Sequence, residues 1–445
     1  MKRKITILGA GLVGSLLAVV LRKRGYEVTV YERRPDMRTN SIGAGRSINM
    51  AMSVRGWAAL DLAGLRKDIE DLAIAMPGRY LHQADGTTAF QPYGSNGEAI
   101  YSISRGELNK RLMTLAEAEG VQIHFNQRVM KVDVSTNTLT FEDGHTETPD
   151  LLLGADGAFS ALRTAYTHQD RVNASQMYIE QGYKELQIPP AEDGSFRMQP
   201  TEALHIWPRR QFMMIALPNP DGSFTCTLFM PFEGEDSFAS LKTPEAVEAF
   251  FRKYFPDALP LMPTLVEDYF TNPTASLITT RIEPWFHEAK SALIGDAAHA
   301  IVPFYGQGMN AGFEDVRVLS ELLDKHADDW AATLPEYSRL RKPNGDAVGA
   351  LALQNFVEMR DKVADDDFLA RKKREKELTH QYPERFRSVY EMVSFSHTPY
   401  DTAIKCTEAQ DRLWESIRHL SADDPQLQTH LAAYDRAVKD LDFGL

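Results

Sequence analysis

Three glycines near the start of the chain are spaced as in a phosphate-binding turn. Gly9, Gly11 and Gly14 lie between an apolar segment at 4–8 and a helical pattern at 15–24. In a strand–turn–helix unit the first glycine permits a tight turn, the second lets a pyrophosphate approach the backbone, and the third allows close packing of helix on strand. The N-terminus of the helix then offers free N–H groups to the phosphates. The spacing therefore predicts a dinucleotide-binding site.

A carboxylate follows at the position where a ribose would lie. Residues 27–31 alternate as a second strand, and Glu32 comes directly after them. A carboxylate there can accept hydrogen bonds from both hydroxyl groups of an adenosine ribose. It would repel a 2′-phosphate, which argues against NADPH as the resident dinucleotide. We expect Tyr31, Arg33 and Arg34 to contact the same cofactor.

Two later segments repeat the order of apolar strand, Gly-Asp or Asp-Gly turn, and helix. The first contains Asp156 and the second contains Asp296. An aspartate at such a strand end can bind the ribityl hydroxyl groups of a flavin. Gly308, Met309 and Asn310 open the helix that follows Asp296, and the positive end of that helix would stabilise negative charge on the reduced flavin ring. The three segments together predict FAD as the cofactor.

In this order the three motifs resemble the FAD-dependent aromatic hydroxylases, which are single-component flavoprotein monooxygenases. The resemblance extends over almost the whole chain. It implies one non-covalently bound FAD, molecular oxygen as the oxidant, and NADPH as a transient co-substrate that reduces the flavin and leaves. The chain has no second GxGxxG pattern for a resident NADPH, which agrees with this expectation.

Five shorter segments carry a closer resemblance, at 46–51, 102–105, 228–232, 302–310 and 355–360. They are similar to segments of the kynurenine 3-monooxygenases within that family. The resemblance implies that four side chains hold the amino-acid end of L-kynurenine: Arg79, Tyr93, Asn355 and Tyr390. It also implies that five residues line the FAD: Val13, Ala51, Arg105, Met130 and Asp296. Eukaryotic members carry a C-terminal hydrophobic anchor, whereas this tail is polar and resembles the bacterial members.

The chemistry of that substrate agrees with these residue types. The planar guanidinium of Arg79 matches a carboxylate with two parallel hydrogen bonds. We expect Phe232 and Phe304 to wall the aromatic ring, and Glu358 to lie at the same site. The amino group on the ring already activates the neighbouring carbon, so no side chain is predicted as a general base, and His299 is expected to be structural. The expected reaction yields 3-hydroxy-L-kynurenine through a flavin C4a-hydroperoxide.

Arg79 and Tyr93 flank a turn at Asp85-Gly86, and the length of the loop decides whether they meet. Residues directly opposite each other in an antiparallel hairpin share a face, and a slip of one residue turns one of them away. A two-residue loop would place Arg79 opposite Pro92. Because both groups must reach one carboxylate, we predict an odd-length loop centred on Gly86, with Arg79 opposite Tyr93.

The order of elements indicates an α/β protein with a second sheet and a helical C-terminal region. We expect a Rossmann-like FAD-binding domain, a mixed β-sheet substrate domain, and a helical region that caps the substrate site and is interrupted at Pro343 and Pro383. The predicted bounds are 1–70, 95–167 and 285–335 for the first, 71–94 and 168–284 for the second, and 336–445 for the third.

The amino-acid composition disfavours several classes of protein. The 445 residues include 49 basic and 62 acidic side chains, and the net charge of −13 disfavours nucleic acid as a partner. Cys226 and Cys406 have neither metal-site nor disulfide spacing, so we expect no metal and a reducing compartment. No apolar stretch reaches the roughly 18 residues of a membrane span. The expectation is a cytoplasmic protein without a membrane anchor, monomeric or homodimeric.

Two alternative functions stay open from the sequence. The first is a related hydroxylase that acts on a phenolic acid. The second is a flavin-binding redox sensor without turnover, which would not need the wall of residues at 303–310. Halogenase chemistry would need a WxWxIP-like segment, and the chain has none.

Overall fold

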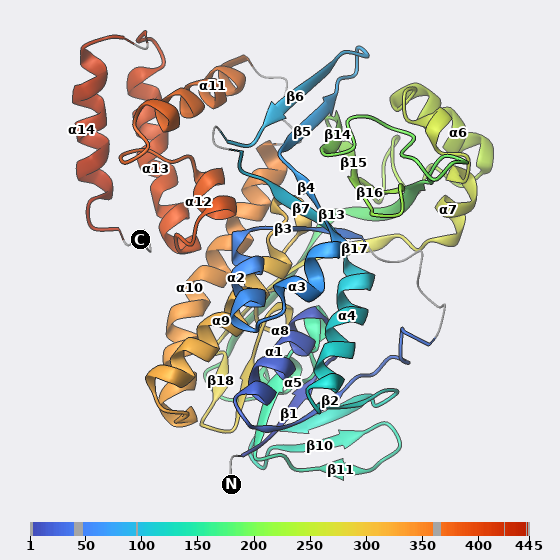
Figure 1. Cartoon of the computed structure of the whole chain (residues 1–445), viewed down its shortest axis with the longest axis vertical. Helices are drawn as coiled ribbons and strands as arrows, with labels where there is room; N and C mark the ends of the chain where they lie inside the picture. Colours follow the sequence, from blue (N-terminus) through green and yellow to red (C-terminus); the bar gives the residue numbers. More distant parts are fainter. Residues whose placement is uncertain are drawn as a thin grey trace.

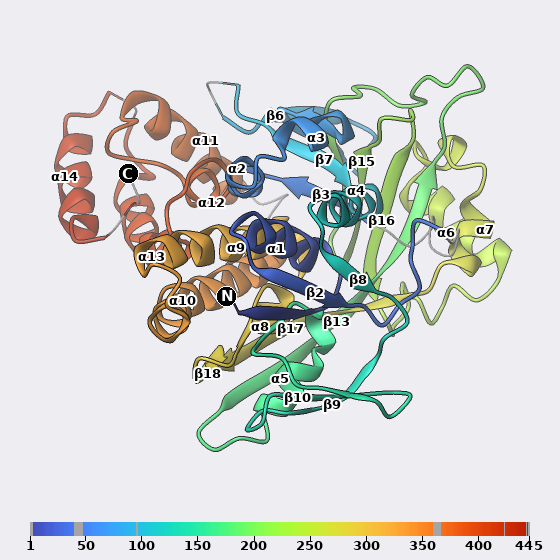
Figure 2. The same cartoon turned by 60° about the horizontal axis from the view of Figure 1, so that its bottom comes forward.

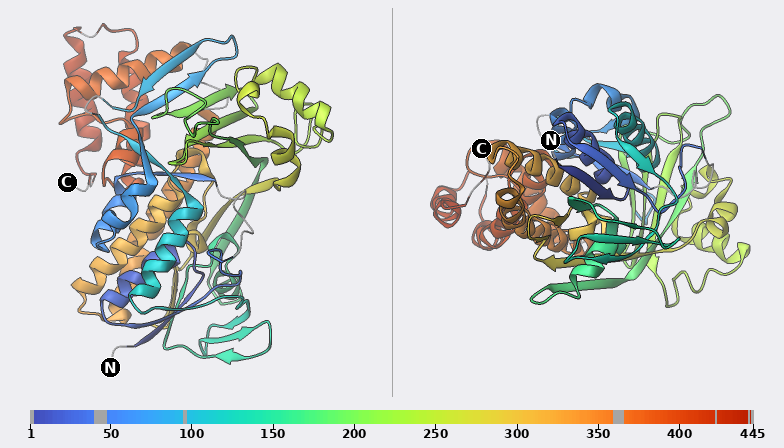
Figure 3. Two further views of the ribbon diagram at one scale, coloured as in Figure 1. Left: turned by 45° about the vertical axis from the view of Figure 1, so that its right-hand side comes forward. Right: turned by 90° about the horizontal axis from the view of Figure 1, so that it is seen from below.

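The computed structural model describes residues 3–39, 48–94, 97–358, 366–421, 423–441 and 443. Arg46 and Arg360, which belong to two of the motifs above, lie outside these residues. Figures 1 and 2 show the C-terminal helices at one side of the molecule and two short helices, α6 (Pro244–Tyr254) and α7 (Leu265–Thr271), at the other. The two large sheets lie between them, and Figure 3 shows the same arrangement.

A six-stranded sheet forms the centre of the dinucleotide-binding part. The strand order is β18-β19-β12-β1-β2-β8, and all neighbours are parallel except β18 and β19. Their bounds are β1 Lys4–Leu8, β2 Glu27–Tyr31, β8 Gln122–His124, β12 Leu151–Gly154, β18 Phe286–His287 and β19 Ser291–Leu293. The apolar residues of β1 and β12 are almost fully buried, as expected of central parallel strands.

Helices cover this sheet and bring the predicted motifs to one edge. Helix α1 (Leu12–Lys23) follows β1 directly and begins earlier than predicted, because extended Gly11 serves as its N-cap. Helix α9 (Gly308–Lys325) packs beside α1. Other helical segments of this part are α2 Val54–Leu62, α3 Arg66–Ile69, η1 Glu70–Leu72, α4 Arg105–Ala118, η2 Gly157–Phe159, α5 Ala161–Tyr166, α8 Asp296–His299 and η4 Pro303–Tyr305.

A seven-stranded sheet forms the second layer, in the order β17-β13-β16-β15-β14-β5-β6. It is antiparallel except between β14 and β5. Its strands are β5 Gly78–His82, β6 Thr88–Pro92, β13 Asn173–Ile188, β14 Leu204–Arg209, β15 Phe212–Pro218, β16 Phe224–Pro231 and β17 Ala275–Glu283. Helices α6 and α7, with η3 (Leu259–Leu261), pack on one face around Trp207, Phe224 and Phe251. The other face is free to wall a cavity.

Two small sheets complete the β-structure. One joins the two layers and consists of β3 (Asn49–Met52), β7 (Ile100–Ser104) and β4 (Ala73–Met76). The other consists of β9 (Val129–Asp133), β10 (Thr138–Phe141) and β11 (Thr146–Glu147), and Figure 1 shows it at the end of the molecule near the N-terminus. The predicted class, an α/β fold with a second mixed sheet and a helical C-terminal region, is confirmed.

The C-terminal region is helical, as predicted. Its helices are α10 Trp330–Val357, α11 Asp366–Gln381, α12 Val389–Phe395, α13 Tyr400–Ile417 and α14 Gln426–Val438. Helix α10 runs through Pro343, so the predicted interruption there is wrong. A buried face around Gly345, which lies against Trp285 and His299, holds this part of the helix despite the lost hydrogen bond. Pro383 does lie beyond the end of α11.

The hairpin of β5 and β6 has an odd-length loop, as predicted, but in a different register. His82 pairs with Thr88, and the loop is centred on Asp85 instead of Gly86. Arg79 therefore lies opposite Gln91, and the prediction that it pairs with Tyr93 is wrong. Because Tyr93 is two residues beyond Gln91, it still shares the face of Arg79. The loop proper is Ala84-Asp85-Gly86, since Gln83 N donates to Thr87 O at 2.9 Å in the same register. Its last residue, Gly86, has the positive φ (+85°) that the common three-residue hairpin loop requires.

In the part of the chain that the structure describes, no helix combines the length and apolar character needed to cross a membrane.

Candidate active site

A cavity of about 320 Å³ opens between the two large sheets. The phosphate turn contributes Gly11 and Val13 to its lining, and the seven-stranded sheet contributes Met213 and Phe229. The further predicted residues on its walls are Ala51, Arg79, Arg105, Asp296, Phe304, Gly308, Met309 and Tyr390. Seven of the sixteen residues expected to bind FAD are therefore gathered around one space.

Each of the three positions in the phosphate turn is occupied by glycine for a different structural reason. Gly9 has a φ of +96°, a conformation that L side chains rarely adopt. A Cβ atom at Gly14 would lie 2.0 Å from the carbonyl oxygen of Gly9, so the packing of helix on turn excludes any side chain. A Cβ atom at Gly11 would meet nothing within 4 Å. The space above Gly11 is thus open to a ligand, as a pyrophosphate site requires.

Glu32 lies against the same turn at the end of β2. Its carboxylate accepts hydrogen bonds from Ala10 N at 2.9 Å and from Arg34 Nε at 2.8 Å. Burial opposes its charge, but the hydrogen bonds and charge of Arg34 outweigh burial and lower the pKa of Glu32. The group is therefore an ionised acceptor, suitable for ribose hydroxyl groups.

Two aspartates end the strands that follow. Asp156 Oδ2 accepts from Ala161 N at 2.7 Å, while the buried Oδ1 has no hydrogen-bond partner among the described residues. Burial raises the pKa of Asp156 because the charged form is poorly solvated. Asp296 begins α8 and lines the cavity. An unpartnered buried acceptor beside the cavity fits a ligand that brings hydroxyl groups.

Asn310 does not face the cavity as predicted. Its Nδ2 donates to Ala51 O at 2.8 Å and to Gly306 O at 2.9 Å, and its Oδ1 accepts from Ser53 N at 2.9 Å. These bonds use its side-chain amide within the protein, so contact with the cofactor through the first turn of α9 stays a prediction. The side chain instead fixes Ala51 and Gly306, and both of these residues lie on the cavity wall.

Four other predicted cofactor residues lie away from this cavity. Met130 is 60% exposed on β9. Tyr31 stacks on His124 with ring centroids 5.2 Å apart. Arg33 is exposed, and Arg34 pairs with Glu32. Their contact with the adenosine end of the cofactor stays a prediction.

A second cavity of about 470 Å³ adjoins the first on the side of the C-terminal helices. The predicted residues Asn355 and Glu358 line it, together with Tyr93. Arg79 and Tyr390 line both cavities, and so do Tyr305, Ile206 and Met213. The boundary between the two spaces is therefore the group of residues that was predicted to hold the amino-acid end of the substrate.

Arg79 lies beside two stacked tyrosine rings. Its guanidinium carbon is 4.6 Å from the ring centroid of Tyr390 and 5.3 Å from that of Tyr93. The two rings stack with centroids 5.4 Å apart, and Tyr390 also stacks on Tyr305 at 5.7 Å. Arg79 Nε and the Tyr93 hydroxyl are buried without a hydrogen-bond partner among the described residues. Burial raises the pKa of Tyr93, so its hydroxyl remains a neutral donor.

The aromatic walls differ from the prediction in one residue. Phe304 lines the flavin-side cavity and packs against Phe229 at 5.0 Å and Phe356 at 4.2 Å. Phe232 lies beyond the end of β16, beside Phe238 and Gly182, and lines neither cavity. The prediction for Phe232 is corrected, and Phe229 takes its place. The alternation of side chains along β16 could have indicated Phe229, but not which face borders the cavity.

Asn355 connects the C-terminal region to this wall. Its Nδ2 donates to Phe304 O at 2.7 Å, which ties α10 to the η4 turn. His299 makes structural contacts, as expected. Its Nε2 lies 2.6 Å from Asp315 Oδ2, and its ring stacks on Trp285.

Comparison with known proteins agrees with this geometry. The model of the FAD binding domain family matches residues 2–351. A kynurenine 3-monooxygenase of Flavobacterium psychrophilum is 49% identical over 422 residues, covering 93% of each chain. The chain belongs to the kynurenine 3-monooxygenase family. A member from Dictyostelium discoideum is 45% identical and covers 99% of this chain and 98% of its own.

The fold of this family member is shared with more distant oxygenases. The tetrameric form of 2-methyl-3-hydroxypyridine-5-carboxylic acid oxygenase superposes with a TM-score of 0.67 at 20% identity, covering 81% of this chain and 94% of that one. The family membership and the FAD binding domain make the protein an FAD-dependent aromatic monooxygenase. The open space above Gly11 and the unpartnered Asp156 Oδ1 fit the pyrophosphate and hydroxyl groups of FAD.

Replacing Gly11 by valine is expected to remove most of the bound FAD while the protein still folds. The new side chain meets no protein atom, and the φ of −74° at this position suits any residue. Absorbance of the purified protein and its thermal midpoint after FAD removal measure the two effects. As a control, valine at Gly14 collides with Gly9 O and should lower the stability itself, by about 1–3 kcal/mol. Full FAD content in the Gly11 variant would contradict the assignment.

Proposed function

We propose that the protein hydroxylates L-kynurenine at ring carbon 3. L-Kynurenine, NADPH, a proton and O₂ are converted to 3-hydroxy-L-kynurenine, NADP⁺ and water, so one oxygen atom enters the ring and the other leaves as water. The observation that carries the proposal is the pair of unpartnered buried donors, Arg79 Nε and the Tyr93 hydroxyl, at the border of the flavin-side cavity. Such a pair suits one carboxylate.

The arrangement divides the substrate between the two cavities. Arg79 and Tyr93 would bind the carboxylate, and Asn355 and Glu358 line the space available to the α-amino group. The aromatic ring would then extend into the flavin-side cavity, between Phe229 and the residues of the η4 turn. Fixing one end of the substrate in this way holds the reacting carbon at one place, which lowers the entropic cost of the reaction.

Bound FAD supplies the redox chemistry, since it accepts electrons from NADPH and activates molecular oxygen. The residues of the chain bind, orient and exclude water. Among the described residues, Asp296 is the one carboxylate on the wall of the flavin-side cavity, and we assign it to the ribityl hydroxyl groups instead of the substrate. This agrees with a substrate whose own amino group activates the ring, because no proton need be taken from it by a side chain.

Substrate-dependent consumption of NADPH is the direct test. We expect slow oxidation of NADPH by the FAD-loaded protein alone, strong stimulation by L-kynurenine, and 3-hydroxy-L-kynurenine as the product by mass spectrometry. 2-Aminoacetophenone, which has the aromatic amine without the amino-acid tail, should stimulate far less. Turnover of 4-hydroxybenzoate without L-kynurenine turnover would favour the phenolic-acid alternative, and absence of any turnover would favour the redox sensor.

We also propose that the protein works in the cytoplasm. Cys226 and Cys406 are buried and unpaired, and a reducing compartment such as the cytoplasm suits free thiols. We also expect the protein to use O₂ and to be a monomer or a homodimer. Size-exclusion chromatography with light scattering tests the oligomeric state.

A further inference from the structure

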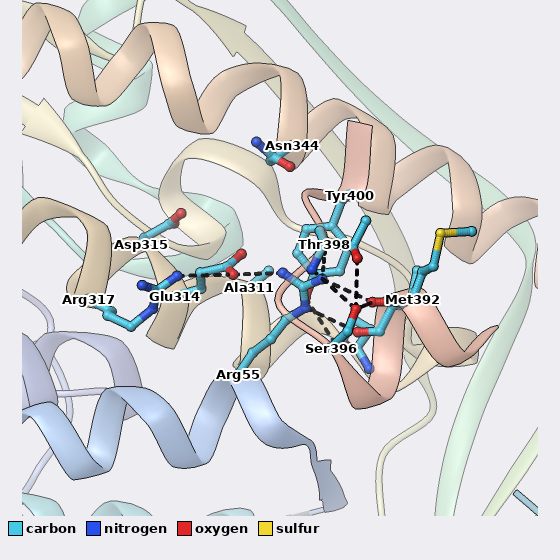
Figure 4. Close-up of polar contacts among 12 residues, drawn as sticks. Arg55, Ala311, Glu314, Asp315, Arg317, Asn344, Met392, Ser396, Thr398 and Tyr400 are labelled. Atoms are coloured by element: carbon cyan, nitrogen blue, oxygen red, sulfur yellow. Dashed lines mark hydrogen bonds and ion pairs between the residues drawn. The ribbon is translucent and has the colours of Figure 1, made fainter. Parts of the chain in front are cut away.

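Arg55 is a fully buried arginine outside both cavities. It lies in the first turn of α2, two residues after the N-cap Ser53, whose backbone N–H binds Asn310 at the start of α9. Its guanidinium points away from α2 into the space between α9 and the segment at 392–400, as Figure 4 shows. A buried guanidinium is costly unless its charge is paired and its N–H groups are bonded, so its partners reveal what holds it there.

The guanidinium joins two separate parts of the chain. Arg55 Nη1 donates to Glu314 Oε1 of α9 at 2.6 Å. On the other side Nε donates to Val393 O at 3.1 Å, and Nη2 donates to Met392 O at 3.3 Å and to Thr398 O. One carboxylate of the flavin-binding helix and three carbonyl groups of the C-terminal region therefore share one planar group.

Two of the three carbonyl groups that Arg55 binds belong to the C-terminal end of α12, and one of them, Met392 O, also accepts from Ser396 Oγ at 2.7 Å. Met392 and Val393 lie in the last turn of this helix, where carbonyl groups have no partner within the helix. The other end of α12 is closed by a capping box between Ser388 and Glu391. A helix of two turns has little stability of its own, so its place depends on these contacts at its ends.

Helix α12 carries Tyr390, the residue that borders both cavities. The ring of Tyr390 lies between Arg79 and Tyr305. A rotation or shift of this short helix would move the ring from Arg79 and open the border between the cavities. The position of Tyr390 is therefore linked, through the backbone of α12, to the guanidinium of Arg55.

A second contact ties the same arginine to the flavin-side wall. The ring of Tyr400 lies 4.0 Å from the guanidinium carbon of Arg55, and its hydroxyl donates to Gln307 Oε1 at 3.0 Å. Gln307 is the N-cap of α9 and directly follows the turn that holds Phe304 and Tyr305. The contacts of Arg55 thus reach both tyrosines of the Tyr305–Tyr390 stack.

We infer that Arg55 is a positioning residue, which fixes Tyr390 against Arg79 and thereby sets the affinity for the amino-acid end of the substrate and the coupling of NADPH oxidation to hydroxylation. The substrate readouts rest on the proposed function. Lysine in its place keeps the charge but cannot bind four acceptors around one plane. Loss of the planar guanidinium should therefore leave FAD in place and allow α12 to move.

The test uses the FAD-loaded protein with two variants. Arg55→Lys is the simpler one. Arg55→Met combined with Glu314→Gln removes one positive and one negative charge together. Buried Arg341 also loses Glu314 in this variant but keeps its ion pair with Asp315. In both we expect the dissociation constant for L-kynurenine, measured by flavin absorbance, to rise about tenfold, within the range of coupling between linked residues. The share of NADPH oxidation that ends as hydrogen peroxide should also rise.

Arg317→Met is the matched control. Arg317 also pairs with Glu314, at 3.5 Å, but its side chain is directed to the α9 surface and to Glu321. It makes no hydrogen bond to the segment at 392–400 among the described residues. We expect this variant to keep the kynurenine affinity and the coupling of the unaltered protein.

A double-mutant cycle separates positioning from simple stabilisation. If Arg55 acts through Tyr390, then Arg55→Lys should weaken kynurenine binding little further in a Tyr390→Leu background. A merely structural role predicts the same added loss in both backgrounds. Equal losses, or unchanged affinity in both Arg55 variants, would overturn the inference.

Hydrogen exchange gives a readout that needs no substrate. In the unaltered protein the amides at 389–395 should exchange together with those of α9, and in folded Arg55 variants they should exchange faster while α9 stays protected. If neither variant folds, hydrogen exchange in the unaltered protein still tests the inference. Opening of 389–395 independently of α9 would overturn it. Failure to bind L-kynurenine in the unaltered protein would instead count against the proposed function alone.

Discussion

Replacing Arg79 by lysine is expected to weaken L-kynurenine binding by about ten- to a hundredfold, equivalent to roughly 1.5–3 kcal/mol for lost hydrogen bonds to a charged group. Lysine keeps a positive charge near Tyr93 and Tyr390, so the change removes the planar fork more than the electrostatic attraction. Arg79 is buried beside the two stacked rings, and its Nε has no hydrogen-bond partner among the described residues. Titration of the bound flavin with L-kynurenine measures the loss.

FAD content is expected to stay unchanged in the same variant, because the phosphate turn and the aspartates at 156 and 296 are untouched. Arg209→Lys provides a control on the neighbouring strand β14. Arg209 binds the carbonyl groups of Tyr254 and His82 and lines neither cavity, so its replacement should leave kynurenine affinity as it was. Unchanged affinity in the Arg79 variant with full FAD content would refute Arg79 as the carboxylate ligand.

The parts of the site that depend on local sequence could be predicted. Gly9, Gly11 and Gly14 follow from the backbone geometry of a single turn, and Glu32 follows from the end of the next strand. The shared face of Arg79 and Tyr93 also follows from period-two alternation along a hairpin. The register of that hairpin does not follow from alternation alone, because it depends on which loop position Gly86 occupies. Its φ of +85° fits the last residue of a three-residue loop instead of the centre.

The parts that depend on contacts between distant segments could not be predicted. Phe229 and Phe232 are three residues apart and equally aromatic, and only the end of β16 separates a wall residue from one outside the cavity. Asn310 lies in the first turn of α9, as its sequence position indicated, but the use of its side-chain amide by Ala51, Gly306 and Ser53 could not be foreseen. Arg55 gave no signal at all, since its partners lie more than 250 positions away along the chain.

Protonation of Glu314 is expected to produce a large loss of stability in acid. Burial opposes the charge of this side chain, but Arg55 and Arg341 outweigh burial and hold the pKa of Glu314 at about 2. Both arginines bind it directly, at 2.6 Å and 2.7 Å, and both are buried. In the unfolded chain a glutamate has a pKa of about 4.3. Because folding depresses the pKa, the stabilisation is complete above about pH 4.3 and is lost as the pH falls through 2.

Glu314→Gln isolates this contribution, because glutamine keeps the shape and cannot ionise. At neutral pH the variant is expected to be less stable by about 3 kcal/mol, since the two arginines lose their shared carboxylate. The difference in free energy of unfolding should shrink between pH 4.3 and 2, which urea denaturation across that range would show. Glu336→Gln is the control: its carboxylate is paired at the surface with Lys325 and His326, where screening leaves little net stabilisation. A difference for Glu314→Gln that stays constant with pH would mean that packing, not charge, accounts for the loss.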